Sequence, residues 1–401
     1  MTRKLLLSGI VLILFYEVIV WVLMPSGRIP EWINFRVTKE YIAVGLALFL
    51  TALIWLETGK LSCPNMWALF FLIFLFFNLS KSPIIGAGND SVEVGVLGNF
   101  TAEFKVFSFF LMFCSIASAR FDDKFIEEII LTIFLSGVVM SVYMILQAMN
   151  LDQIFKPKPE YFNTDVKALR VAGTFGQPTL AVPFLAMCIP LAVYSRSALG
   201  LIALMVLPTA MLLTGSDFAF ASLLLLTLLY SFRSKIFSYI LTFTLLVIPA
   251  LLFFKPLQFF NDNGRFNAWW LILGDVFSGE INGLPVRFGL FGAGLNNFAL
   301  FRSFHETVFM HAHNEYLQVL WCGGVIGLAL FLMIHIDIIQ KAVDWISEKR
   351  IKAIFFSLLV VMLCSFGTFV MQLGAYQFLI VLMAGLIYQI ANNQEAKHAG
   401  R

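Results

Sequence analysis

Charged residues are scarce in this chain. Of its 401 residues, 13% are Asp, Glu, Lys or Arg and 60% are hydrophobic, whereas soluble domains typically carry about 25% charged and about 45–50% apolar residues. The formal net charge is only +3, and the basic residues are spread over many connections instead of forming one stripe. The composition therefore argues against a single soluble core, and nucleic acid is not expected as a partner.

Cysteine motifs are also missing. The cysteines stand singly in or beside apolar runs, without the C-x-x-C spacing of a zinc or redox site and without a disulfide framework. We interpret them as small buried hydrophobic side chains. They are Cys63, Cys114, Cys188, Cys322 and Cys364.

Long apolar runs are what the sequence does have. They are about 16–23 residues long and are separated by short polar stretches, and about 20 helical residues cross a bilayer. Residues 1–401 are therefore predicted to form a single all-α, polytopic integral membrane domain with about twelve transmembrane helices. The first run has no small-residue cleavage site, so we expect a retained helix there. The predicted spans are roughly 5–23, 40–57, 65–79, 104–118, 125–147, 179–194, 198–214, 217–231, 236–254, 315–338, 353–371 and 374–390.

The distribution of basic residues predicts the orientation. If the N-terminus is cytoplasmic, the short connections with Arg120, Lys124, Arg233 and Lys349 all fall inside, which satisfies the positive-inside rule. An even number of spans then places both termini in the cytoplasm. Three outward segments are too long to be simple turns, and loops of that length are usually functional or disordered. They are residues 80–103, 148–178 and 255–314.

The last of these loops, between the ninth and tenth spans, contains an expected helix. In "GRFNAWWLILGDVF", Phe266, Trp269, Trp270 and Leu273 recur at helical spacing, and tryptophan favours the membrane interface. We therefore predict a short interfacial helix. The following "GLFGAGLNNF" has glycines that permit unusual backbone turns. It lies outside any alternating strand and helix pattern, so a dinucleotide site is not indicated.

Histidines concentrate around one short stretch, "FMHAHNEYLQVLWCGGVIGLALFL". His311 and His313 lie in it, and His305 just precedes it. His313 comes before the tenth span, near a helix N-terminus, where the helix dipole disfavours a charged imidazolium. A neutral imidazole is what a general base requires. Two alternatives are solvated interfacial histidines and a metal site, although a helix would point the H-x-H pair in different directions. We expect no metal.

Two arginines in the outward loops suggest phosphate binding. Arg170 lies in "ALRVAGTFGQPTLAVP" and Arg265 in "NDNGRFNAWW", each beside glycine and close to a membrane boundary. Arginine binds phosphate through two parallel N–H bonds and stays charged, which suits a diphosphate-bearing substrate. Each could instead be an interfacial charge reaching toward water. Gln177, in the same stretch as Arg170, and Arg302 are further substrate-binding candidates.

Asp217 is the acidic candidate. It follows Ser216 at the outward turn "LLTGSDFAF" between the seventh and eighth spans, and an acidic residue at membrane depth is a functional candidate by default. The pair could equally be an N-cap that opens the eighth helix.

Several of these stretches together resemble one family. "HAHNEYLQVLWCGGVIGLALF", preceded by "GRFNAWW" and "GLFGAGLNNF", resembles the O-antigen ligase and polymerase superfamily of bacterial envelope glycosyltransferases. The late signature of that family reads approximately R, a few residues, W, then G-x-G-x-x-x-F, then H-N-x-x-L-Q and E-x-G-x-x-G. "LRVAGTFGQPTLAVPFL" is similar to its earlier R-x-x-G segment, and its layout has about twelve spans with a large periplasmic loop between the ninth and tenth.

The resemblance implies a metal-independent, inverting glycosyltransferase in the bacterial inner membrane, with its active site facing the periplasm and no cofactor. Such an enzyme moves a glycan from a polyprenyl (undecaprenyl) diphosphate carrier to an acceptor hydroxyl, such as a lipid A-core sugar. By resemblance, His313 matches the family's essential histidine, Asn314 its neighbour and Arg265 the arginine of the large loop; His311 is a further candidate for substrate binding.

The chain departs from the family pattern at two positions. Asp217 stands where the family commonly has the arginine of a Ser-Arg pair, and Cys322 stands where it commonly has a glutamate. Arg170 is a candidate to replace the missing phosphate contact. Other readings are a glycan polymerase, a protein-glycan ligase and, in a different class, a transporter or flippase for lipid-linked sugars. The transporter is disfavoured because the candidates gather at one face and the span interiors are almost uncharged.

Overall fold

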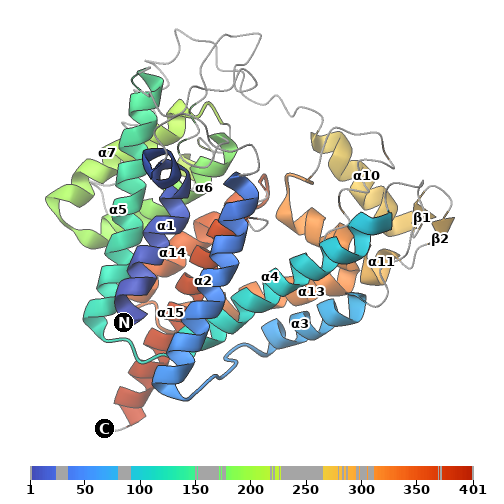
Figure 1. Ribbon diagram of the computed structural model, residues 1–401, viewed down its shortest axis with the longest axis horizontal. Helices are drawn as coiled ribbons and strands as arrows, with labels where there is room; N and C mark the ends of the chain where they lie inside the picture. Colours follow the sequence, from blue (N-terminus) through green and yellow to red (C-terminus); the bar gives the residue numbers. More distant parts are fainter. Residues whose placement is uncertain are drawn as a thin grey trace. The chain divides into compact units, whose positions relative to one another are not determined.

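A computed structural model of the chain describes eight main stretches of residues and some shorter pieces between them (Figure 1). The main stretches are 2–23, 35–79, 92–149, 178–216, 265–278, 288–294, 311–368 and 374–399. The chain divides into two compact units. Unit 1 comprises Met1–Ala43, Phe121–Asn261 and Ile346–Cys364, and unit 2 comprises Val44–Arg120, Asp262–Trp345 and Ser365–Arg401.

The described parts are almost wholly helical. Four described helices are long and apolar enough to cross a membrane, judged by length and composition: Glu40–Thr58, Asp123–Ala148, Glu315–Asp344 and Gly374–Ala399. The prediction of an all-α membrane protein is confirmed at this level. The predicted spans 217–231 and 236–254 fall almost entirely outside the described residues. None of the five cysteines forms a disulfide, and all but Cys63 are buried, as expected of small apolar side chains.

Unit 1 is built around three tightly packed helices. Its described helices are α1 (Thr2–Leu23), α5 (Asp123–Ala148), α6 (Pro178–Ser195), α7 (Ala198–Leu213) and α14 (Lys349–Cys364). α6 packs against α7 and α14, while α5 contacts α1, α6 and α7. Gly137 on α5 lets Cys188 on α6 approach so closely that a Cβ at Gly137 would overlap its side chain. α2 (Phe35–Thr58) begins in unit 1 and continues into unit 2.

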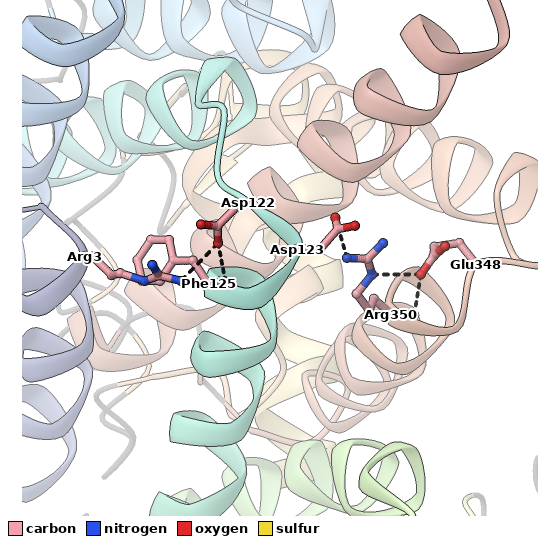
Figure 2. A network of polar contacts seen from close by, with 6 residues as sticks. All are labelled: Arg3, Asp122, Asp123, Phe125, Glu348 and Arg350. Carbon is pink, nitrogen blue, oxygen red and sulfur yellow. Dashed lines mark hydrogen bonds and ion pairs between the residues drawn. The ribbon is translucent and has the colours of Figure 1, made fainter.

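Paired charges hold the start of α5 in unit 1 (Figure 2). Asp122 is the N-cap of α5, and its carboxylate also receives Arg3 of α1 at 3.0 Å. The next residue, Asp123, forms an ion pair with Arg350 of α14, with Oδ1 and Nη1 2.6 Å apart. The Nε atom of Arg350 also lies 2.8 Å from Oε1 of Glu348. Two adjacent carboxylates thus tie α5 to two other helices.

Unit 2 contains the candidate site. Its described elements are α3 (Met66–Leu79), α4 (Val92–Ser118), α10 (Arg265–Ser278), α11 (Phe288–Phe291), α13 (Glu315–Asp344), α15 (Gly374–Ala399) and an antiparallel pair of two-residue strands, β1 (Glu280–Ile281) and β2 (Leu284–Pro285). α3 runs beside both α4 and α13 (Figure 1). The Tyr388 hydroxyl of α15 donates to Asp337 of α13 and accepts from Asn65, at the start of α3, at 3.3 Å.

α13 reverses direction at Gly324. This residue has φ 63° and ψ −168°, which no helix accommodates. The rings of Tyr316 and His335 lie 6.2 Å apart, although 19 residues of straight helix would separate them by about 28 Å. Residues 315–323 therefore fold back along residues 325–344. The predicted span 315–338 is thus two helical segments, of which the second is long enough, at about 30 Å, to cross a bilayer.

The glycine-rich loop, which contains Gly289, Gly292 and Gly294, supplies the hydrogen-bond donors that the reversal of α13 needs. A break in a helix frees carbonyl groups, which are costly to leave unsatisfied away from water. The N–H groups of residues 293 and 294 donate to the carbonyls of Trp321, at 3.0 Å, and Cys322, at 2.8 Å. A Cβ at Gly292 would overlap the backbone of Cys322, and Gly292 itself has φ 70°. The predicted backbone turns in this loop are confirmed, and they bring its N–H groups to the free carbonyls of α13.

Candidate functional site

The turn of residues 311–314 leads directly into α13 in unit 2 and carries the candidate base. His313 has φ 50°, in the left-handed region. That region costs a residue with a Cβ about 1–2 kcal/mol. Such strain persists only where the surroundings fix the conformation, and it concentrates at functional sites.

Two side chains fix the residue just before His313. The indole Nε1 of Trp269 donates to the carbonyl of Ala312 at 2.6 Å. The backbone N–H of Ala312 donates to Oε1 of Gln318 at 3.1 Å. Both polar groups of this buried residue are therefore held by side chains, so the turn cannot rotate away from its strained form without losing both bonds.

Asn314 fixes the other side of the turn. It is the N-cap of α13, with its side-chain oxygen accepting the N–H of Leu317 at 3.1 Å. The next N–H, of Glu315, donates to the carbonyl of Ser365 at 2.8 Å. The sequence suggested Asn314 as a substrate-binding residue, but its oxygen serves as a helix cap, which aims His313 at a set angle to α13.

Burial and a neighbouring charge keep the imidazole neutral. Burial and, to a smaller extent, the positive charge of Arg265 together lower the pKa of His313 from 6.5 to about 4. Arg265 is the first residue of α10, so the two candidates that the sequence placed 48 positions apart act on each other within unit 2. At neutral pH the site thus combines a fixed cation with an uncharged proton acceptor.

A second contact locks α10 to α13. The carboxylate of Asp275 accepts the indole N–H of Trp321 at 3.1 Å and lies 2.8 Å from Nε2 of His305. Around it, Ala268 and Ile272 join Trp321 in a buried cluster. His305 is therefore engaged with a carboxylate on α10. Among the described residues, no three His, Cys, Asp or Glu side chains gather as metal ligands do.

The orientation of α10 corrects one expectation. The spacing grouped Trp269 with Phe266, Trp270 and Leu273 as one interfacial set. Trp269 instead points inward to Ala312, whereas Phe266 and Trp270 are exposed. Sequence spacing could not separate the two tryptophans because both sides of α10 are apolar.

Four candidates lie outside the described residues: Arg170, Gln177, Asp217 and Arg302. Near the first two, Gly173 has φ 59° and donates its N–H to Oε1 of Gln147 on α5 at 3.0 Å. Val171 is buried. Gly173 is therefore anchored on α5 in unit 1. Near Asp217, the carbonyl of Ser216 accepts the N–H of Ala219 at 2.9 Å.

Three residues complete the site in roles that the sequence reasoning did not give them: Trp269 as a donor to the turn, Gln318 as its acceptor, and Asp275 as the link to α13. Gln318 could have been found, since it is the glutamine of the H-N-x-x-L-Q pattern. Asp275 is the only acidic residue of α10, which was a weaker signal. A scan against protein-family models finds no matching family, and a search of curated proteins finds no match.

Proposed function

We propose that the chain is a membrane glycosyltransferase that moves a glycan from a polyprenyl diphosphate carrier to an acceptor hydroxyl, in the manner of an O-antigen ligase. It would act at the periplasmic face of the bacterial inner membrane, with about twelve spans around the site. The observation that carries the proposal is the pairing of a neutral, strained His313 with Arg265. This is the chemistry needed to deprotonate a hydroxyl beside an anionic leaving group.

The reaction balances with the residues at hand. The acceptor oxygen attacks the anomeric carbon from the side opposite the diphosphate, and a new C–O bond forms while the bond from carbon to phosphate oxygen breaks. The diphosphate leaves with the bonding electron pair and is neutralised by Arg265, with Arg170 as a second candidate contact. The hydroxyl proton passes to the ring nitrogen of His313. Attack from the opposite side inverts the anomeric centre.

The two departures from the family pattern bear on this proposal. Asp217 cannot replace an arginine as a phosphate ligand, which leaves that role to Arg170 or Arg302. Cys322 is buried against the glycine-rich loop, where its carbonyl accepts the N–H of Gly294. A glutamate side chain at this position would have to fit into the same buried space beside the break in α13. We therefore interpret position 322 as structural in this chain.

Acceptor identity separates the related alternatives. A polymerase would use a second carrier-linked glycan, and a protein-glycan ligase would use a side-chain hydroxyl; both would keep the same base and cation. A transporter for lipid-linked sugars would instead need charged groups along a path through the membrane. Asp337, a carboxylate within the second segment of α13, is hydrogen-bonded to Tyr388, so it has a role in helix packing. This favours the enzyme over the transporter.

The test uses purified full-length protein in lipid nanodiscs with an undecaprenyl diphosphate-linked glycan. The acceptors are lipid A-core, a second carrier-linked glycan and a serine-containing peptide. His313→Asn is the key variant because asparagine tolerates positive φ, so the turn should survive. We expect kcat to fall by about 10²–10⁴-fold, with His398→Asn, on the last turn of α15, as the unaffected control.

Arg265→Lys should recover only part of the activity that Arg265→Ala loses, since lysine has no bidentate fork. Wild-type rates in His313→Asn would refute the base, and wild-type rates in Arg265→Ala would refute the diphosphate contact. Loss of wild-type activity on adding a chelator would return a metal ion to consideration. Turnover of none of the three acceptors would overturn the proposed function itself.

A further inference from the structure

α10 has a second apolar face that the site does not use. Helical residues are about 100° apart around the axis, so Phe266, Trp270 and Phe277 fall within an arc of about 40°. Phe266 is 65% exposed, Trp270 75% and Phe277 81%. These three residues form what we call the aromatic stripe, whereas the nearby Leu273 is half-buried and packs against the cluster around Trp321.

The opposite side of the same helix is fully occupied. Ala268, Ile272, Asp275 and Val276 are buried, and the first two pack in the cluster with Trp321 of α13. The orientation of α10 is therefore fixed by this face and by the bonds from Trp269 and Trp321. The aromatic stripe cannot turn inward without breaking those bonds, so its exposure follows from the packing and is not a free rotation of the helix.

The chemistry of the stripe fits a lipid surface. The only charged residues of α10 are Arg265 and Asp275, and neither lies in the stripe. Tryptophan and phenylalanine are the side chains that favour the region between headgroups and acyl chains. α10 is also attached to α13, whose second segment is apolar and long enough to span a membrane. With 14 residues, α10 is about 21 Å long and too short to cross alone.

A protein partner fits less well. Stable protein interfaces use about 20–30 residues on each side, and the stripe offers three side chains on one short helix. Exposed aromatic groups of this kind are costly in water, at about 25 cal/mol for each Å² of apolar surface. A lipid surface removes that cost without requiring a complementary shape.

We propose that α10 docks against the lipid bilayer through Phe266, Trp270 and Phe277. The stripe contacts the upper acyl chains, and the opposite face holds the turn with His313. The lipid therefore braces the helix that begins with Arg265 and that fixes Ala312 through Trp269. The docking itself does not depend on the proposed glycosyl transfer.

Two adjacent tryptophans provide a matched test. Full-length protein is reconstituted in phosphatidylcholine vesicles whose acyl chains are brominated near the headgroup or left unbrominated, and its fluorescence is compared with that of Trp270→Phe and Trp269→Phe. We expect the emission contributed by Trp270 to be lost in brominated lipid, because bromine quenches on contact. The emission contributed by Trp269, which faces Ala312, should persist.

A second pair of variants guards against misfolding. Phe277→Ser, in the stripe, should make the Trp270 emission less blue-shifted and should weaken its quenching by bromolipid. Asn267→Ser, exposed but outside the stripe, should leave both the Trp270 emission and its quenching unchanged. Quenching of Trp270 by aqueous acrylamide and not by bromolipid would overturn the proposal. So would protection from both quenchers together with a dimer that Phe277→Ser dissociates, since a second copy of the chain would then cover the stripe.

Discussion

Arginine is used in opposite ways in the two units. In unit 1, Arg3 pairs with Asp122 and Arg350 pairs with Asp123, and these two adjacent carboxylates lie at the start of α5 (Figure 2). In unit 2, the pKa of His313 is lowered by burial and also by the positive charge of Arg265, which would repel a protonated imidazole. The first arrangement favours folding, because opposite charges are paired. The second arrangement favours a neutral base and an anionic ligand.

The supports of the two regions differ accordingly. In unit 1, charged side chains hold the start of α5. Unit 2 holds the His313 turn with neutral groups: the indole of Trp269, the amide of Gln318 and the cap of Asn314. Neutral supports leave the local charge of the site to be set by Arg265. The comparison teaches that the start of α5 depends on paired charges and the His313 turn on neutral contacts and close backbone packing. Three predictions test this difference, from the largest expected effect to the smallest.

Gly324→Ala should be the most damaging change. A methyl group there would overlap the backbone at Leu290, and the residue has a left-handed φ of 63°. Overpacking and backbone strain together should cost more than about 3 kcal/mol of unfolding free energy. Thermal unfolding in detergent measures the loss. Gly323→Ala is the matched control, because its Cβ would lie 3.7 Å from Phe74, an ordinary contact. Equal stability of the two variants would show that the break does not rest on backbone packing.

The second prediction concerns acid. The folded pKa of His313 is about 4, below its ordinary 6.5, so the unfolded chain binds more protons between these values. Stability should therefore fall as the pH drops from about 6.5 to about 4, by up to about 3 kcal/mol from this residue. In His313→Asn that part of the slope should vanish. The difference between the two unfolding curves across this pH range is the measurement, and parallel curves would refute the burial of a neutral imidazole.

The third prediction compares the arginines of unit 1. Arg350 is 7% exposed and bonds two carboxylates, so Arg350→Met should cost about 1.5–3 kcal/mol. The Arg3 side chain is 39% exposed, so Arg3→Met should cost about 1 kcal/mol or less. Both variants should keep the pH dependence contributed by His313. If either removed that dependence, the separation of roles between the two units would be wrong.

Part of this organisation was predictable from the sequence. Run lengths and the scarcity of charge predicted an all-α membrane protein, because helix length and lipid thickness leave few other solutions. The motif order paired Arg265 with His313, and these two do interact electrostatically in unit 2. The roles of Arg170, Gln177, Asp217 and Arg302 stay predictions, and so do the number of spans and the orientation.

Other features could not be predicted, for physical reasons. The reversal at Gly324 does not alter the hydropathy of the segment, so a folded-back helix and a straight one give the same profile. The inward turn of Trp269 depends on which of two apolar faces packs, and periodicity gives faces without assigning partners. Asp275 becomes a link only because the fold brings Trp321 and His305 to it from 30 to 46 residues away.

The reversal at Gly324 also has a consequence for the order of biosynthesis. Residues 293 and 294, which donate to the carbonyls of Trp321 and Cys322, are synthesised before α13 begins. The partners of the broken helix therefore already exist when the break leaves the ribosome, and folding can proceed from the N-terminal side. Ser365, which accepts the N–H of Glu315, is made about fifty residues later. The turn that holds His313 thus reaches its final form only after α14 has been added to the chain.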